Sequence, residues 1–365
     1  MLRANAKARR SSPWVRGATS QMHSNDRKKI MKTVRGSNRT KLLTNAAVAG
    51  GVAAAALAAT AAWVTRKAQR AEHDCPPVGR FVDVDGVRLH YIEKGSGQPV
   101  VLVHGNVVRL EDFMSCGLVD RLAERYRVLA FDRPGFGHSE RPRDRLWTAQ
   151  AQAVLLQKAL STLGVEEPIV LGHSWGALVA LAFGLHDKAA VRQLILVSGY
   201  YYPTVRLDVP VAAIPAIPVI GDAMRYTVSA VFARLLMKRT VKAMFAPQAV
   251  PPNFLPVLSR EMMLRPQQLR ANAEDAAMMI PAAASLCKRY SELTIPVTIF
   301  AGAADKIVDP DRHARQLHSE LRNSELRILP GVGHMAHYSA LEEIASAITP
   351  SRFDLPVPEP RMAAV

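Results

Sequence analysis

Cysteine is scarce in this sequence, with three residues in a chain of 365. Cys75, Cys116 and Cys287 form no CxxC pair, and no histidine lies near them at the spacing of zinc ligands. We therefore predict no metal site, and we expect no cofactor. If the protein is exported, one disulfide between two of these cysteines is an alternative. Because the number of cysteines is odd, at least one thiol is then free.

Acidic residues are also few, with 31 Asp and Glu against 47 Lys and Arg and a net charge of +16. The excess is concentrated in residues 1–41, which contain twelve Lys or Arg and the single acid Asp26. This segment accounts for +11 of the charge, so the body of the protein is only mildly basic. We interpret residues 1–41 as a disordered basic arm and predict no nucleic-acid partner.

Charged residues are absent from residues 42–65, which read LLTNAAVAGGVAAAALAATAAWVT and are followed by Arg66 and Lys67. That length can span a bilayer, although the alanine-rich composition makes the segment weakly hydrophobic. Three interpretations compete: a signal anchor, an export signal cleaved near Ala59-Thr60-Ala61, and a soluble alanine-rich helix. Either Met1 or Met31 can be the first residue of the protein, because a signal that begins at Met31 has a more ordinary length and charge than one that begins at Met1.

The distribution of positive charge predicts the orientation of this segment. The basic arm would stay in the cytoplasm, which places the rest of the chain on the periplasmic or extracellular side. We therefore predict membrane attachment through residues 42–65, with a soluble exported or a cytoplasmic protein as the alternatives.

From about residue 76 the sequence alternates short apolar runs with amphipathic stretches. RFVDVDGVRLHYIEKG predicts a β-hairpin around Asp85-Gly86, and six further runs predict strands covered on both faces. These runs are PVVLV, YRVLAF, PIVLGH, QLILV, PVTIF and LRILP, most of them separated by helical patterns. The expected fold is α/β, with a mostly parallel eight-stranded sheet and helices on both faces, formed by residues 76–200 and 291–350.

Residues 201–290 contain no clear strand and interrupt this alternation. We interpret them as a helical cap over the carboxyl ends of the strands, where open α/β sheets bind ligands. A helical layer without a ligand role is the alternative. Residues 351–365 are rich in proline and predict a flexible tail.

A serine stands between two glycines in VLGHSWGALV, at the junction of a predicted strand and a predicted helix. Gly172, Ser174 and Gly176 match the G-x-S-x-G pattern of a nucleophile elbow in the required setting. Small neighbours are needed because the sharp turn brings strand and helix close together. Ser174 is therefore a candidate nucleophile, and the backbone N–H of Trp175 is a candidate oxyanion donor.

A serine hydroxyl needs a base and an orienting carboxylate before it can attack a substrate. His334 follows the last predicted strand in LPGVGHMAH, with His337 as the less favoured alternative. Asp305 follows the preceding strand, whereas Asp309 reads as a turn or cap residue. The order Ser174, Asp305, His334 is the order of nucleophile, acid and base in hydrolases built on this kind of sheet.

A second oxyanion donor is expected in the loop after VVLVHGN, from the backbone N–H of Asn106 or, failing that, of Val107. The glycine-containing loop at residues 132–142 lacks both the Lys-Ser/Thr ending of a P-loop and G-x-G-x-x-G spacing, so we assign it no nucleotide and no chemistry.

Together, VHGN, DRPGFGHS, GHSWGA, AGAADKIV and GVGH occur in the order found in the α/β-hydrolase superfamily, which residues 76–350 resemble. The resemblance implies a helical cap, nucleophile Ser174, acid Asp305, base His334 and oxyanion donors Asn106 and Trp175. Relatives that resemble dehalogenases or epoxide hydrolases use aspartate at the elbow, so the serine favours acyl transfer.

The expected function is hydrolysis of a carboxylic ester with an apolar part, through an acyl-enzyme. The alternatives are hydrolysis of a C–C bond, an amide or a lactone by the same residues, or a non-catalytic, membrane-tethered binding protein of this fold.

Overall fold

The computed structural model describes residues 24–188, 190–206 and 209–348. The chain divides into two units, Met1–Ala58 and Ala59–Val365. Helix α1 (Ser24–Asp74) begins in the first unit and ends in the second. We expected residues 24–41 to be disordered, but they form the first part of this helix. Lysine and arginine, which are frequent in this segment, are good helix formers. The rest of the basic arm and the predicted tail at 351–365 lie outside the described residues.

The apolar part of α1 is exposed along most of its length. By length and composition, Met31–Asp74 is a helix that can cross a membrane, a criterion that signal sequences also meet. In the second unit, Val64 and Ala71 of α1 are buried, and Glu72 forms an ion pair with Arg265 at 2.7 Å. The end of α1 is thus packed against the folded unit.

An eight-stranded sheet forms the centre of the second unit, in the order β1-β2-β4-β3-β5-β6-β7-β8. The predicted hairpin is β1 (Arg80–Val84) and β2 (Val87–Lys94), joined at Asp85-Gly86. β1 pairs with β2 and β2 pairs with β4 antiparallel, and the five remaining pairs are parallel. The predicted runs form β3 (Pro99–Val103), β4 (Arg127–Phe131), β5 (Ile169–His173), β6 (Gln193–Val197), β7 (Val297–Gly302) and β8 (Ser324–Leu329).

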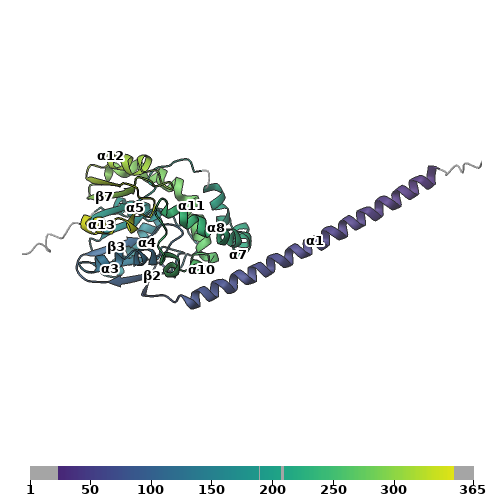
Figure 1. Cartoon of the computed structure of the whole chain (residues 1–365), viewed down its shortest axis with the longest axis horizontal. Helices are drawn as coiled ribbons and strands as arrows, with labels where there is room; N and C mark the ends of the chain where they lie inside the picture. The colour runs from purple at the N-terminus through teal and green to yellow at the C-terminus, as the bar shows by residue number, and fades with distance from the viewer. Residues whose placement is uncertain (1–23, 189, 207–208, 349–365) are drawn as a thin grey trace, which may run out of the picture. The chain divides into compact units, whose positions relative to one another are not determined.

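Helices cover both faces of this sheet (Figure 1). On one face, α4 (Ala149–Thr162) and α5 (Trp175–His186) pack on alternate strand residues such as Val101 and Val103. On the other face, α3 (Leu118–Ala123) and α13 (Leu341–Ala347) pack on Val100 and Leu102. The shorter helices are α2 (Glu111–Ser115), the π-helix Asp311–Arg315, α12 (Gln316–Glu320) and the 3-10 turn Ala336–Tyr338.

Between β6 and β7, the described part of the chain is helical and contains no strand. The bounds are α6 (Val209–Ala213), η1 (Ile214–Ala216), α7 (Ile220–Tyr226), α8 (Val228–Phe245), α9 (Phe254–Leu258), α10 (Arg260–Met263), α11 (Pro266–Leu286) and η2 (Cys287–Glu292). We call this segment the cap segment. All three cysteines are free and partly buried.

Candidate active site

Ser174 occupies a sharp turn between β5 and α5, with φ 54° and ψ −116°. Positive φ is unfavourable for a residue with a side chain, so the surrounding structure must enforce it. A Cβ atom at Gly172 would overlap the carbonyl of Gly176, and one at Gly176 would overlap the carbonyl of Val103. Both glycines are thus required by close backbone contact, for the steric reason expected of an elbow.

Three of the predicted site residues come together at the carboxyl ends of the strands. His334 Nε2 lies 3.0 Å from Ser174 Oγ, and His334 Nδ1 lies 2.8 Å from Asp305 Oδ2. The other oxygen of Asp305, Oδ1, accepts hydrogen bonds from the backbone N–H groups of Ile307 and Val308. With the carboxylate on one side, the imidazole presents Nε2 to the serine hydroxyl.

Asp309, the alternative acid, is exposed and lies in a turn. Its Oδ1 accepts hydrogen bonds from the backbone N–H groups of Asp311 and Arg312. It makes no hydrogen bond to His334 in the described chain, so the geometry favours Asp305 as the partner of the histidine.

The predicted oxyanion residues, Asn106 and Trp175, line the same cavity as Ser174 and His334. Val107, the alternative donor, has φ 72°, and its N–H donates to Asn272 Oδ1 of α11 at 2.8 Å. Because that N–H already has a partner in the cap segment, the geometry favours the N–H of Asn106.

Arg133 is a residue of this site that the sequence analysis missed, since it assigned no chemistry to residues 132–142. Its guanidinium donates to the carbonyls of His104 and Gly105 and to Asn106 Oδ1, at 2.8, 3.0 and 2.8 Å. It also forms a buried ion pair of 2.5 Å with Asp275 of α11. Arg133 therefore holds the loop formed by His104, Gly105 and Asn106 and joins this loop to the cap segment. The feature of the sequence that could have revealed this role is an arginine two residues after the predicted strand YRVLAF.

His104 fixes the other side of this loop. Burial lowers the pKa of its imidazole to about 3, so the ring is neutral. Its Nδ1–H donates to the Gly105 carbonyl at 2.7 Å, and Nε2 accepts the N–H of Arg133 at 3.0 Å. His104 thereby fixes the turn that precedes Asn106.

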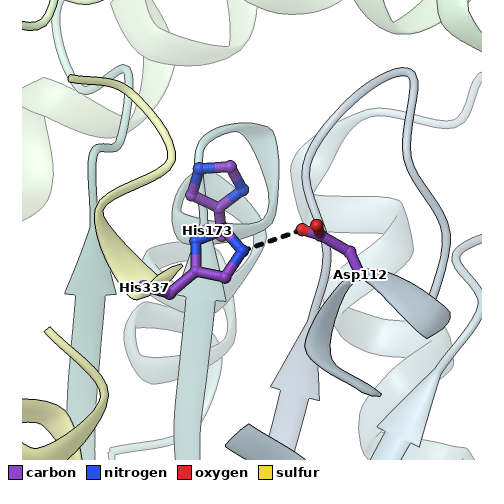
Figure 2. Close-up of side chains that lie close together, drawn as sticks. All are labelled: Asp112, His173 and His337. Atoms are coloured by element: carbon purple, nitrogen blue, oxygen red, sulfur yellow. Dashed lines mark hydrogen bonds and ion pairs between the residues drawn. The ribbon is translucent and has the colours of Figure 1, made fainter. Parts of the chain in front are cut away.

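His337, the alternative base, lies away from the serine. It is completely buried, and its Nε2 is 3.0 Å from Asp112 Oδ2 (Figure 2). His173 lies against it, with the ring centroids 4.3 Å apart. Burial holds the pKa of His173 well below its usual range, so the ring is neutral and its Nε2–H donates to the carbonyl of His334 at 3.1 Å. His173 thereby supports the backbone of the base.

Asp112, His173 and His337 offer ligand atoms within 4.8 Å of one another, a spacing that a metal ion could accept. Asp112 is already engaged by His337 and by the hydroxyl of Tyr338 at 2.9 Å. These three residues fit a hydrogen-bonded network in the core better than a metal site. Within the described chain, Nδ1 of His173 and Nδ1 of His337 have no hydrogen-bond partner.

A cavity of about 970 Å³ lies between the strand ends and the cap segment. Its walls are mainly apolar, and the cap segment contributes residues such as Met224, Phe232, Leu236 and Met279. The few polar groups include Asn106, Ser174 and His334. Ser174 and His334 therefore face a cavity whose walls are mainly apolar.

Comparison with known proteins agrees with this architecture. Residues 98–341 match the family described as alpha/beta hydrolase fold. The chain belongs to this family. The α/β hydrolase is 29% identical over 276 residues to an uncharacterized protein of Mycobacterium tuberculosis, covering 71% of this chain and 76% of that protein. It is 31% identical over 136 residues to 2-hydroxymuconate semialdehyde hydrolase of Pseudomonas sp., covering 36% of this chain and 48% of that protein.

Solved structures share the fold of this α/β hydrolase at low sequence identity. An esterase from Exiguobacterium antarcticum aligns with TM-score 0.61 and 21% identity, covering 74% of this chain and 97% of the esterase. An enol-lactonase from Burkholderia xenovorans aligns with TM-score 0.61 and 17% identity, covering 73% of this chain and 97% of the lactonase. The predicted family and fold class are thus confirmed, and the relatives identify a hydrolase.

Proposed function

We propose that this α/β hydrolase cleaves a carboxylic ester with Ser174 as nucleophile, His334 as base and Asp305 as orienting acid. One observation carries the proposal: the continuous hydrogen-bonded series from Ser174 Oγ through His334 to Asp305. Such a series increases the nucleophilicity of the serine, because the imidazole takes its proton as the oxygen attacks.

The reaction follows from these positions. His334 Nε2 removes the proton of Ser174 Oγ, and the oxygen attacks the ester carbonyl. The N–H groups of Asn106 and Trp175 stabilise the negative charge that develops on the carbonyl oxygen. The protonated imidazole then gives its proton to the leaving alcohol, which leaves an acyl-enzyme. Water, deprotonated by His334, attacks that acyl group and releases the acid and the free serine.

The cavity supports an apolar ester as substrate. Its volume of about 970 Å³ accommodates a ligand considerably larger than a short-chain ester, and its walls are mainly aliphatic and aromatic. Burial of each methylene group of the substrate contributes about 0.8 kcal/mol. A lipid-like acyl or alcohol part therefore matches the chamber better than a charged one.

A second candidate reaction uses the same residues. The matched 2-hydroxymuconate semialdehyde hydrolase and the enol-lactonase carry names for C–C bond and lactone substrates. A substrate panel of esters, lactones, amides and vinylogous diketones distinguishes these reactions, since each product is measured separately.

Replacement of Ser174 by alanine tests the proposal. Ser174→Ala should reduce hydrolysis of a short-chain nitrophenyl ester to the rate without enzyme, while circular dichroism and thermal unfolding stay close to those of the wild type. Turnover by the folded variant would contradict the assignment of Ser174.

A fluorophosphonate probe provides an independent measurement, because it labels activated serines. A single adduct on Ser174, found by peptide mass analysis, is expected. An unlabelled, folded wild-type protein without turnover on the panel would favour a non-catalytic binding protein.

A further inference from the structure

Exposed apolar side chains are concentrated on one part of the cap segment. In the described chain from residue 59 onward, seventeen large apolar side chains are exposed, and twelve of them lie between residues 205 and 236. Elements α6, η1, α7 and α8 contact one another, so they form a continuous layer (Figure 1). Monomeric soluble proteins rarely expose apolar groups at such density without a partner.

Two strongly exposed residues of this set are not needed to fill the cavity. Val219 and Leu235 are 78% and 72% exposed, and neither lines the cavity. Val219 also has φ 67°, a conformation that is strained for a β-branched residue. An exposed valine held in a strained turn suggests a function outside the stability of the fold.

The same layer borders the cavity of the candidate active site. Val211, Ile214, Phe232 and Leu236 are exposed and line the cavity as well. The outer apolar surface and the inner apolar wall are therefore continuous.

Helix α8 combines this surface with positive charge. Its N-terminal half exposes Val228, Val231, Phe232, Leu235 and Leu236, and its C-terminal half exposes Lys238, Arg239 and Lys242. No acidic residue occurs within α8. An apolar surface next to lysine and arginine is complementary to the acyl region and the anionic headgroups of a phospholipid surface.

The end of α1 indicates why a bilayer is the favoured occupant. Trp63 is the last aromatic residue of the apolar run at 42–65, and tryptophan is enriched at membrane interfaces. Its ring lies 4.7 Å from the guanidinium carbon of Arg234 on α8. Where residues 42–65 cross a membrane, Trp63 therefore brings α8 to the level of the headgroups.

We propose that α6, η1, α7 and α8 form a second membrane contact, which docks the mouth of the cavity on an anionic phospholipid surface and admits an apolar ester from the bilayer. The admission of an ester rests on the proposed function, whereas the docking itself does not. Residues 42–65 would attach the chain, and the cap segment would orient its cavity toward the lipid.

A lipid cross-linking experiment tests the docking directly. The full chain is reconstituted into phosphatidylcholine vesicles containing about a quarter phosphatidylglycerol, doped with a diazirine-bearing phospholipid. After illumination, lipid adducts are expected on residues 211–236 as well as on 42–65. Adducts confined to 42–65 would overturn the proposal.

A matched pair of variants tests the delivery of substrate. In Val219→Asp with Leu235→Asp, we expect hydrolysis of a long-chain ester embedded in the vesicles to fall about tenfold, because two apolar contacts with lipid are replaced by charges. Hydrolysis of a soluble short-chain ester should not change. The control, Val78→Asp with Leu146→Asp, alters two exposed apolar residues outside the layer and should behave as the wild type.

The outcomes separate the two proposals. Equal rates for both double variants on the embedded ester would overturn the delivery role of the surface. Absence of turnover on every ester would contradict the proposed function, while the cross-linking result would still decide whether the surface docks on lipid.

Discussion

At the scale of single residues, the candidate site depends on which polar group each side chain contacts. Asp305 and Asp309 are four residues apart in one loop, yet one contacts the histidine and the other closes a turn. The same distinction separates His334 from His337, which is buried against Asp112. Residue type alone does not distinguish these pairs, whereas position relative to the strand end does.

The pair of aspartates gives a sharp test of the assigned acid. Asp305→Asn should lower kcat for the short-chain ester by about 10⁴-fold, because the imidazole loses the partner that selects its tautomer and stabilises its protonated form. Steady-state kinetics measures this effect.

The matched variant Asp309→Asn removes an exposed turn carboxylate in the same loop. It should keep kcat within about twofold and lower the free energy of unfolding by about 1 kcal/mol or less. A loss of kcat in Asp309→Asn equal to that in Asp305→Asn would contradict the assignment.

At the scale of elements, buried charges join the cap segment to the sheet. Asp275 of α11 accepts from Arg133 at 2.5 Å and from Arg141 at 3.0 Å, and all three side chains are almost fully buried. Arg133 also donates to the carbonyls of His104 and Gly105, so we expect the position of α11 to affect the proposed oxyanion donor Asn106.

Loss of the charge of Asp275 should therefore affect both stability and rate. Asp275→Asn leaves two buried guanidinium groups without their shared carboxylate, and the free energy of unfolding should fall by about 3–5 kcal/mol. The folded fraction should also show a lower kcat with little change in KM. Urea unfolding and ester kinetics measure the two effects.

An exposed ion pair provides the control for this experiment. Asp120→Asn breaks the contact with Lys94, in which both side chains are more than half exposed, and should cost less than about 1 kcal/mol. Equal destabilisation by the two variants would show that burial does not decide the strength of these ion pairs.

A buried histidine next to β6 makes stability depend on pH. His313 Nδ1 accepts the N–H groups of Tyr201 and Tyr202, and burial lowers the pKa of the imidazole to about 4. The unfolded chain, with an ordinary histidine pKa near 6.5, binds more protons. The stability linked to His313 is thus present above about pH 6.5 and is lost as the pH falls toward 4, by about 3 kcal/mol.

Unfolding by urea across this range checks the effect. In His313→Gln, the loss of stability between pH 6.5 and 4 should be smaller than in the wild type. The exposed His318→Gln should leave the wild-type slope unchanged. An identical slope in all three proteins would contradict the role of His313.

The sequence predicts the strands well, because strands depend on local patterns. Each predicted apolar run forms a strand, and the Asp85-Gly86 hairpin is present. The contacts of Asn272 with Val107 and of Asp275 with Arg133 were missed, since each joins residues more than a hundred positions apart. No local pattern encodes such long-range pairs. The catalytic roles, the domain bounds and the cap interpretation stay predictions.

At the scale of the whole molecule, the apolar part of α1 contrasts with the folded unit that follows it. Residues 42–59 are exposed, whereas Val64 is buried against the folded unit, which has its own large core. The length and composition of this helix fit a membrane span, and a signal sequence meets the same criterion.

Arginine substitutions in the apolar part of α1 test whether this helix is inserted in a membrane. Val52→Arg with Leu57→Arg should move the full chain from the membrane fraction to the soluble fraction, because each arginine opposes insertion by about 2.5–3.5 kcal/mol. Val34→Arg, outside the apolar run, should stay with the membrane. Fractionation with carbonate extraction measures this distribution, and intact mass shows whether the segment is retained. A soluble wild-type chain shortened near Ala61 would instead identify a cleaved export signal.

The buried ion pairs of Asp275 also limit how a substrate enters and leaves. Swinging α11 away from the sheet would separate two guanidinium groups from their carboxylate, at a cost of several kcal/mol on every turnover. We therefore expect α11 to stay against the sheet, and any movement that admits a substrate to involve α6 to α8. Engineering of substrate range in this hydrolase should begin with those helices, whose described residues take no part in the ion pairs of Asp275.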